Sequence, residues 1–225
     1  FWTGMMRSLL FVPANDAKRI ARVHKRGADA IVLDLEDGVS LEAKVEARAG
    51  IAAAAARITA HGATVFVRVN ADWRDDLASV LIPEVSGIVA PKIADAASAA
   101  AVAAAIKDKA EARSVALIAL IESAAGLFNA PAIAAVEGVS ALALGGEDLC
   151  AELGVPPSQE ALDLPCKLIA LAAASRGLAA LGAPASIGDF RELDGYREAV
   201  GRARAIGMSG TLCIHPAQVA IANAG

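Results

Sequence analysis

Hydrophobic and polar positions follow two rhythms along this chain. Short runs of Val, Ile, Leu and Ala are followed by longer alanine-rich runs with helical spacing, and Gly, Pro, Asn or Asp stand at the joints. The short runs predict strands at 8–13, 30–34, 64–69, 87–91, 115–121, 139–144, 179–187 and 210–214. The longer runs predict helices at 16–26, 41–57, 75–81, 95–112, 124–136, 160–176 and 193–206.

The strand at 115–121 is apolar at every position, which is typical of a parallel strand covered on both faces. Eight such strands, each followed by a helix, predict a (β/α)8 barrel of the TIM type, an α/β fold. The alternative is an open doubly wound sheet, but the turn after the first strand has neither a GxGxxG fingerprint nor a Walker lysine. We therefore expect one barrel domain over residues 5–225.

Both ends of the chain lead to further expectations. Residues 1–4 precede two methionines, and we interpret them as a remnant that does not belong to the fold. The chain stops soon after the eighth strand, so either the last helix is short or a C-terminal lid is missing, and we favour the second interpretation.

The composition excludes several classes of function. The net charge is −4 with no basic block, which argues against nucleic-acid binding. No apolar run approaches the ~18 residues that a membrane-spanning helix needs. Three cysteines without a CxxC pair indicate buried, reduced thiols in a cytoplasmic protein, and three histidines are too few and too scattered for a zinc cage.

Polar residues follow six of the predicted strands, and in a barrel of this type ligands bind at the C-terminal ends of the strands. The segments concerned are 34–38, 68–70, 91–92, 122–123, 145–148 and 215–216. Because residues so far apart in sequence converge on one rim, we predict an enzyme.

Glu122 and Asp148 end neighbouring strands and are candidate ligands of one Mg²⁺ ion, because this cation prefers carboxylate and water oxygens. The alternative is that one acid caps a helix and the other pairs with a nearby Lys or Arg. Gly145 and Gly146 precede Asp148 and would let the backbone approach a ligand closely.

Arg68 ends an otherwise apolar strand and must find an anion, since a buried unpaired guanidinium is costly. It could clamp a substrate carboxylate, form an internal ion pair with Asp34 or Glu36, or do both. Asp34, Glu36 and Asp37 form a cluster of like charges that needs a cation, a donor or a raised pKa. One of them could hold a metal-bound water.

Four further residues have weaker signals. Lys92 could form a Schiff base, but we do not expect it, because the acid pair and Arg68 already suggest a metal route. His215 could act as a general base, but a lone histidine is more often a hydrogen-bond donor in a loop. Lys18 and Arg22 share one face of the first predicted helix, which is either solvated or in contact with a phosphate.

Several segments together carry a family resemblance. They are RSLLFVPAND at 7–16, LDLEDGV at 33–39, VRVN at 67–70, IESAAG at 121–126, LGGEDL at 144–149 and CIHPAQV at 213–219. They occur in family order over nearly the whole chain and resemble the citrate lyase beta-subunit-like branch of the HpcH/HpaI aldolase family. That resemblance implies a Mg²⁺-dependent (β/α)8 barrel, trimeric or hexameric, that cleaves or forms C–C bonds in 3-hydroxyacyl thioesters.

The resemblance also implies roles for individual residues. Glu122 and Asp148 would be the metal ligands, and Arg68 would grip the acid end of the substrate, with the Gly146 backbone contacting the oxo acid. We take Arg68, Glu36 and Asp37 as the candidate catalytic residues. In members that use coenzyme A, basic residues at the positions of Lys18 and Arg22 face the phosphates, and the backbone of Ile214 and His215 lies along the CoA arm.

The activity that this resemblance implies is retro-Claisen cleavage of a citramalyl-, malyl- or citryl-CoA type substrate into acetyl-CoA and a 2-oxo acid. Many members supply a catalytic Asp from a C-terminal lid that reaches a neighbouring subunit, and this chain ends before such a segment. Two alternatives stay open: a pyruvate-releasing aldolase that does not use CoA, and a non-catalytic lyase subunit that binds an acyl-carrier protein.

Overall fold

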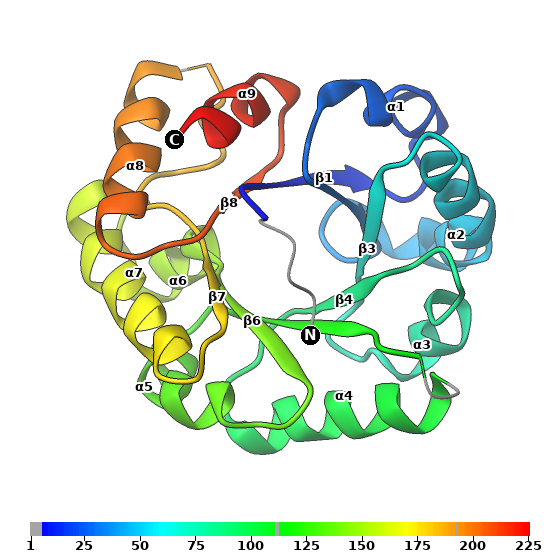
Figure 1. Ribbon diagram of the computed structural model, residues 1–225, viewed down its shortest axis with the longest axis horizontal. Helices are drawn as coiled ribbons and strands as arrows, with labels where there is room; N and C mark the ends of the chain where they lie inside the picture. The colour runs from blue at the N-terminus through cyan, green and yellow to red at the C-terminus, as the bar shows by residue number, and fades with distance from the viewer. Residues whose placement is uncertain (1–5, 111–112, 192) are drawn as a thin grey trace.

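A computed structural model describes residues 6–110, 113–191 and 193–225, in which eight parallel strands form one closed sheet (Figure 1). The sheet order is β7-β6-β5-β4-β3-β2-β1-β8. The strands are β1 Ser8–Pro13, β2 Ala30–Asp34, β3 Thr64–Arg68, β4 Gly87–Ala90, β5 Ala116–Ile121, β6 Val139–Leu144, β7 Ala179–Leu181 and β8 Thr211–Cys213.

The ring closes between β7 and β8. Leu181 forms a parallel bridge with Gly210, and the Gly182 N–H donates to the Gly210 carbonyl at 2.8 Å. One residue earlier, the Ser209 N–H donates to the Ala180 carbonyl at 2.7 Å. The predicted (β/α)8 barrel is therefore confirmed, and the open-sheet alternative is wrong.

Helices surround the barrel and cover the outer face of the strands (Figure 1). They are α1 Ala17–Ile20, α2 Lys44–Thr59, α3 Arg74–Val80, α4 Ala96–Lys109, α5 Ala124–Ala134, α6 Gly146–Leu153, α7 Gln159–Ala174, α8 Leu193–Ala205 and α9 Pro216–Ala224, with 3₁₀ turns η1 Val23–Arg26 and η2 Leu41–Ala43. No helix among the described residues is long and apolar enough to cross a membrane.

Two predicted elements differ from the structure, and one helix is additional. The helix expected at 16–26 is two short pieces, α1 and η1, so Arg22 stands at the junction between them and not on a continuous helical face. Strand β7 is three residues long, because the segment after it turns away. Helix α6 was not predicted, since it begins directly at the glycine pair after β6. Residues 1–4, the predicted remnant, and residues 111–112, the predicted end of the fourth helix, lie outside the described residues.

Apolar side chains form two concentric layers. The outer layer packs strands against helices, and the inner layer fills the barrel with side chains from every strand and none from a helix. Phe66 is fully buried in this inner layer. The three cysteines are free and buried, as predicted.

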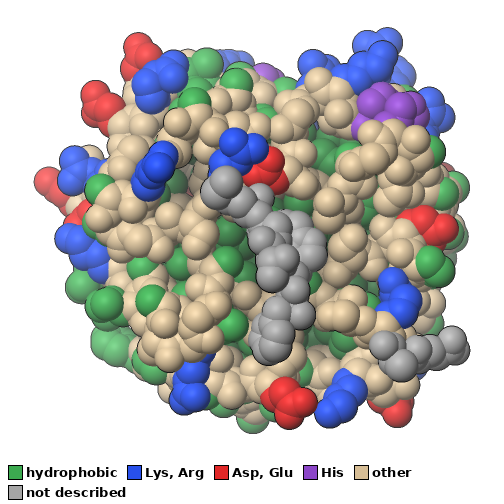
Figure 2. All heavy atoms as spheres, viewed as in Figure 1, with side chains coloured by type: hydrophobic (Ala, Val, Ile, Leu, Met, Phe, Trp, Pro, Cys, Tyr) green, Lys and Arg blue, Asp and Glu red, His purple; other side chains and the backbone are tan. Residues whose placement is uncertain are grey.

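The surface carries charges of both signs. Figure 2 shows Lys and Arg side chains in separate groups around the edge of one face, with Asp and Glu side chains between them. This distribution agrees with the small net charge of −4.

Gly87 determines how the inner layer fits together. It pairs in register with Phe66 on the neighbouring strand, and a Cβ at Gly87 would lie 2.2 Å from Phe66 Cε1 and 2.8 Å from the Ala116 carbonyl oxygen. The second of these atoms belongs to the backbone of a buried strand and cannot move aside easily.

We predict that Gly87→Ala lowers the free energy of unfolding by about 2 kcal/mol, because the added methyl overpacks the barrel. Urea denaturation followed by circular dichroism measures the change. Gly50→Ala is the matched control: a Cβ there meets nothing within 4 Å inside α2, so it should be neutral or stabilising by up to ~1 kcal/mol. Equal effects of the two substitutions would contradict the packing argument.

Candidate active site

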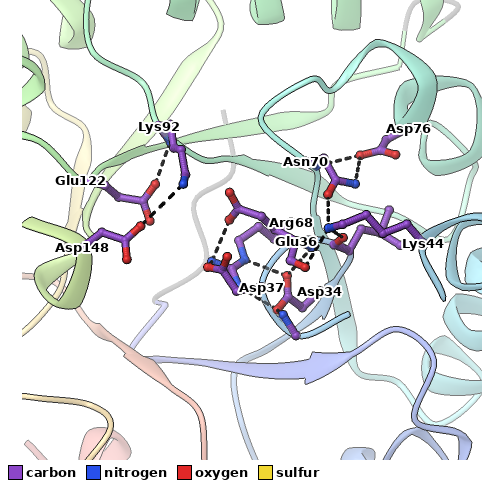
Figure 3. A network of polar contacts seen from close by, with 12 residues as sticks. Asp34, Glu36, Asp37, Lys44, Arg68, Asn70, Asp76, Lys92, Glu122 and Asp148 are labelled. Atoms are coloured by element: carbon purple, nitrogen blue, oxygen red, sulfur yellow. Dashed lines mark hydrogen bonds and ion pairs between the residues drawn. The ribbon is translucent and has the colours of Figure 1, made fainter. Parts of the chain in front are cut away.

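The inward-facing side chains change from apolar to charged at the C-terminal ends of the strands. Every second side chain of a strand faces the interior of the barrel. Asp34 is the next inward-facing residue after Val32 on β2, and Arg68 is the next after Phe66 on β3. Glu122 follows Leu120 in the same way, one residue beyond β5. The strand register therefore places all three charges inside the mouth of the barrel (Figure 3).

Arg68 is the centre of a buried ion-pair network. Its Nε and Nη2 donate to the two carboxylate oxygens of Asp34, each at 2.7 Å, and Nη1 donates to Asp37 Oδ2 at 3.1 Å. The side chain is 11% exposed, and its Cζ lies 5.3 Å from the centre of the Phe11 ring. Burial opposes the charge, but Asp34, followed by Glu36 and Asp37, raises the pKa of the guanidinium. The internal ion pair considered from the sequence is thus present.

The bidentate pair also shapes the loop after β2. Asp34 accepts the N–H of Glu36 at 2.9 Å and that of Gly38 at 2.8 Å, so one carboxylate holds both the turn and the guanidinium. A Cβ at Gly38 would lie 2.5 Å from Asp34 Oδ2, and only glycine leaves room for this contact.

Glu36 is almost completely buried beside Arg68. Its Oε2 lies 2.9 Å from Arg68 Nη1 but lacks hydrogen-bond geometry, so the atom has no hydrogen-bond partner. Burial raises the pKa of this carboxyl to about 7, and the charge of Arg68 only partly opposes the rise. The carboxyl is thus buried and ion-paired, with one oxygen that accepts no hydrogen bond.

Glu122 and Asp148 approach each other across Lys92 (Figure 3). The Lys92 N–H donates to Glu122 Oε2 at 2.7 Å, and Lys92 Nζ lies 3.9 Å from Asp148 Oδ2. Burial raises the pKa of Glu122 to about 7, and the Asp148 carboxylate adds to the rise. Neither acid caps a helix: Ser123 is the N-cap of α5, and Asp148 lies within the first turn of α6.

Gly145, rather than Gly146, makes room for the metal-site candidate. A Cβ at Gly145 would lie 2.4 Å from Glu122 Cγ and 2.8 Å from its Oε1, whereas at Gly146 it would meet only Leu162 at 3.1 Å. Gly145 therefore leaves room for the Glu122 side chain, whereas Gly146 allows close packing against Leu162 of α7.

The donor set suits a hard divalent cation such as Mg²⁺. Glu122 and Asp148 line a cavity of about 380 Å³ together with Lys92 and Ser123. No cluster of three or more His, Cys, Asp or Glu side chains able to hold a metal occurs in the described part of the chain. Two carboxylates at an open cavity leave the remaining coordination positions to water and substrate oxygens, as Mg²⁺ sites usually do.

A larger cavity of about 760 Å³ adjoins the Arg68 network. Its lining brings together the four residues that the resemblance linked to coenzyme A: Lys18, Arg22, Ile214 and His215. Arg68, Asp34 and Asp37 line the same cavity, so the ion-pair network borders it. His215 caps α9 by accepting the Ala217 N–H at 3.2 Å, which occupies its Nδ1.

Two supporting networks were missed at the level of sequence. Lys44 donates to the carbonyls of Leu35 and Glu36, each at 2.9 Å, and to the side chain of Asn70, which in turn donates to the fully buried Asp76. These contacts lock the Glu36 loop onto α2 and the loop after β3. In the sequence, Lys44 looks like an ordinary exposed helix lysine, so no sequence feature identified its supporting role.

Glu147 supports the opposite side of the mouth. It accepts the Ser186 hydroxyl at 2.7 Å and the N–H groups of Ile187 and Gly188 at 3.0 and 3.2 Å. The adjacent acids therefore diverge: Asp148 lines the rim cavity, whereas Glu147 anchors the loop after β7.

Fold and site together define a (β/α)8 barrel with two carboxylates at one cavity of its mouth and a buried arginine ion-pair network beside a second cavity. The sequence profile of the HpcH/HpaI aldolase/citrate lyase family matches residues 7–216, and the chain belongs to this family.

Relatives share most of the chain. A citrate lyase subunit beta-like protein of Deinococcus radiodurans is 40% identical, over 98% of this chain and 79% of its own length. A (3S)-malyl-CoA thioesterase of Cereibacter sphaeroides is 33% identical, over 97% and 76%. An L-malyl-CoA/beta-methylmalyl-CoA lyase of Rhodobacter capsulatus is 31% identical, over 96% and 77%.

Solved structures agree with the barrel. The citrate lyase beta subunit of Mycobacterium tuberculosis, complexed with oxaloacetate and magnesium, superposes with a TM-score of 0.81 at 30% identity, covering 98% of this chain and 96% of that one. A structure of CitE from the same organism, with magnesium, acetoacetate and coenzyme A, has a TM-score of 0.79 at 30% identity, covering 96% and 79%.

The raised pKa of Glu122 predicts a pH-dependent stability. The folded protein binds the Glu122 proton more tightly than the unfolded chain does. The stability that this protonation contributes is therefore complete below about pH 4.5 and is lost as the pH rises through about 7. As the pH rises from 5 to 8, we expect the ionisation of Glu122 to reduce the free energy of unfolding of the metal-free protein by about 2 kcal/mol.

Glu122→Gln removes this contribution, so its stability should fall less steeply than that of the wild type over the same range. Denaturant unfolding in EDTA at several pH values measures the difference. Glu137→Gln, an identical change at an exposed site, is the control and should follow the wild type. Parallel pH profiles for wild type and Glu122→Gln would refute the assignment.

Proposed function

We propose that the protein is a Mg²⁺-dependent C–C lyase that cleaves a 3-hydroxyacyl-CoA thioester into acetyl-CoA and a 2-oxo acid. The observation that carries this proposal is the pairing of Glu122 and Asp148 at one cavity of the barrel mouth, where Arg68 borders a second, basic cavity. The family relationship supports it, since relatives are named as malyl-CoA lyases and a related CitE structure holds magnesium and coenzyme A.

In this proposal Glu122 and Asp148 hold the cation, and the Lys92 N–H orients the Glu122 carboxylate. When bound, Mg²⁺ would polarise the oxygen of the oxo acid as a Lewis acid. The Gly146 backbone would lie against the same acid, at the N-terminal end of α6, where N–H groups favour an anion.

Arg68 would bind the substrate carboxylate from its position in the network. Asp34 fixes the plane of the guanidinium through two hydrogen bonds, so the orientation of the clamp is set before substrate arrives. Glu36 and Asp37 flank the same group. The Glu36 carboxyl, whose pKa burial raises to about 7, would exchange a proton with a substrate hydroxyl or a water molecule.

The larger cavity would hold the coenzyme A portion. Lys18 and Arg22 supply positive charge where its phosphates would lie, and the Ile214–His215 segment borders the path from there to Arg68. Arg19 and Arg26 line the same cavity and add to its positive charge.

We extend the proposal to assembly and location. Phe128 on α5 and Leu164 and Leu171 on α7 are exposed by 81%, 62% and 69%, and a contact between copies in a homotrimer or hexamer would cover them. The buried, unpaired cysteines are consistent with a cytoplasmic protein.

The decisive experiment is a cleavage assay on citramalyl-, malyl- and citryl-CoA with Mg²⁺ or EDTA, with release of acetyl-CoA measured by chromatography. We expect turnover of at least one thioester that EDTA abolishes. Turnover of keto-deoxy sugar acids without CoA would favour the aldolase alternative, and absence of turnover together with binding of an acyl-carrier protein would favour the non-catalytic one.

Glu122→Gln and Asp148→Asn should each reduce lyase activity by roughly 100-fold or more, because loss of even a supporting contact at a metal site costs 10- to 100-fold. Calorimetric titration with MgCl₂ should show weakened binding in both variants. Glu152→Gln, on the same helix as Asp148 but outside the cavity, should keep both properties. Retained Mg²⁺ binding in the first two variants would refute the ligand assignment.

Lys18→Ala combined with Arg22→Ala should raise KM for the CoA thioester by about 10-fold, the loss expected for one charged contact with a phosphate, and leave kcat nearly unchanged. The effect should shrink as salt is added. Lys25→Ala is the matched control, since Lys25 lies on the same segment but does not line the cavity. An equal rise in KM for the control would contradict this placement of coenzyme A.

A further inference from the structure

Lys92 has an unusual backbone conformation. Its φ of 55° is the single positive value among the non-glycine residues that the structure describes. This left-handed region is unfavourable for a residue with a Cβ, and such strain persists only where the surroundings enforce it.

The surroundings that enforce it lie on β5. Successive N–H groups of a parallel strand point to opposite neighbours, but here the N–H groups of Lys92 and Ile93 both turn to the β5 side. The first donates to Glu122 Oε2 at 2.7 Å and the second to the Leu120 carbonyl at 3.1 Å. The left-handed turn thus fixes one oxygen of Glu122, and the strain is coupled to the candidate metal site.

The side chain of Lys92 lies at the same site (Figure 3). Its ammonium is 3.9 Å from Asp148 Oδ2, and its charge also acts on Glu122 and Glu36. Arg68, the other nearby cation, is already engaged by Asp34, Glu36 and Asp37. Among the described residues, Lys92 is therefore the cation that lines the Glu122–Asp148 cavity.

The contact between Lys92 and Asp148 is weak enough to be exchanged. The two side chains are 54% and 46% exposed, and the separation of 3.9 Å is too long for a hydrogen bond. By contrast, the backbone contact between Lys92 and Glu122 is short and buried on the Glu122 side. One residue thus makes a fixed contact with one acid and a loose contact with the other.

We propose that Lys92 is a displaceable counter-ion of the metal site: its backbone holds Glu122 in place, and its ammonium neutralises the acid pair until a divalent cation replaces it. This inference rests on the proposed function, because it uses the Mg²⁺ site formed by Glu122 and Asp148. Lys92 is then a positioning residue, and the metal and the ammonium compete for the same carboxylates.

Calorimetric titration of the purified protein with MgCl₂ tests the competition directly. Lys92→Gln and Lys92→Gly both remove the ammonium and should bind Mg²⁺ roughly 3- to 10-fold more tightly than the wild type, because a like charge leaves the site. Lys92→Arg keeps the charge and should stay within about twofold. Lys107→Gln removes an exposed lysine that pairs with Glu137 at 3.4 Å, and it should also match the wild type.

Thermal unfolding in EDTA separates the two contacts. Lys92→Gln should have a lower Tm than the wild type, since the acid pair loses its counter-ion, and saturating MgCl₂ should close the gap. Lys92→Gly should have a higher Tm than Lys92→Gln, because glycine adopts the left-handed conformation freely and keeps the N–H that Glu122 accepts.

The outcomes distinguish this inference from the function on which it rests. Failure of the wild type to bind Mg²⁺ would overturn the metal site and the counter-ion together. Binding by the wild type with an unchanged or weakened affinity in Lys92→Gln would overturn the counter-ion alone. A tighter affinity in both uncharged variants, with Lys92→Arg and Lys107→Gln unchanged, is the result that supports displacement.

Discussion

The bidentate ion pair between Arg68 and Asp34 is the contact on which the rest of the site depends. A guanidinium inside the mouth of a barrel loses most of its hydration, and that loss is compensated only by closely placed carboxylates. Asp34 provides two oxygens to Arg68 and uses the same two oxygens to accept the N–H groups of Glu36 and Gly38. One interaction therefore sets the clamp and the acid-bearing loop together.

Excess negative charge is the second constraint on the mouth of the barrel. Burial raises the pKa values of Glu36 and Glu122 to about 7, and neighbouring carboxylates add to the rise. Such a site is suited to a cation, and the strained backbone at Lys92 and the glycine at 145 both position Glu122. The backbone strain at Lys92 and the missing side chain at Gly145 are therefore explained by the position that Glu122 must take.

Much of the fold was predictable because its signals are local. The eight strands are short, continuously apolar and separated by helical runs, and the structure confirms all of them, with β7 shorter than expected. Helix α6 was missed because it follows β6 with only Gly145 between them and no conventional capping residue. The split of the first helix was missed because Arg22 has no helix-breaking side chain.

The sequence by itself determined which residues follow each strand, and the rule that parallel strands end at one rim was enough to select Arg68, Glu122 and Asp148. Only the tertiary structure decided how each one is used: that Asp34 occupies two donors of Arg68, that Gly145 rather than Gly146 accommodates Glu122, and that Lys92 lies between the two acids. The reason is physical: register and spacing identify a rim, whereas distances between side chains of different strands depend on closure of the whole barrel.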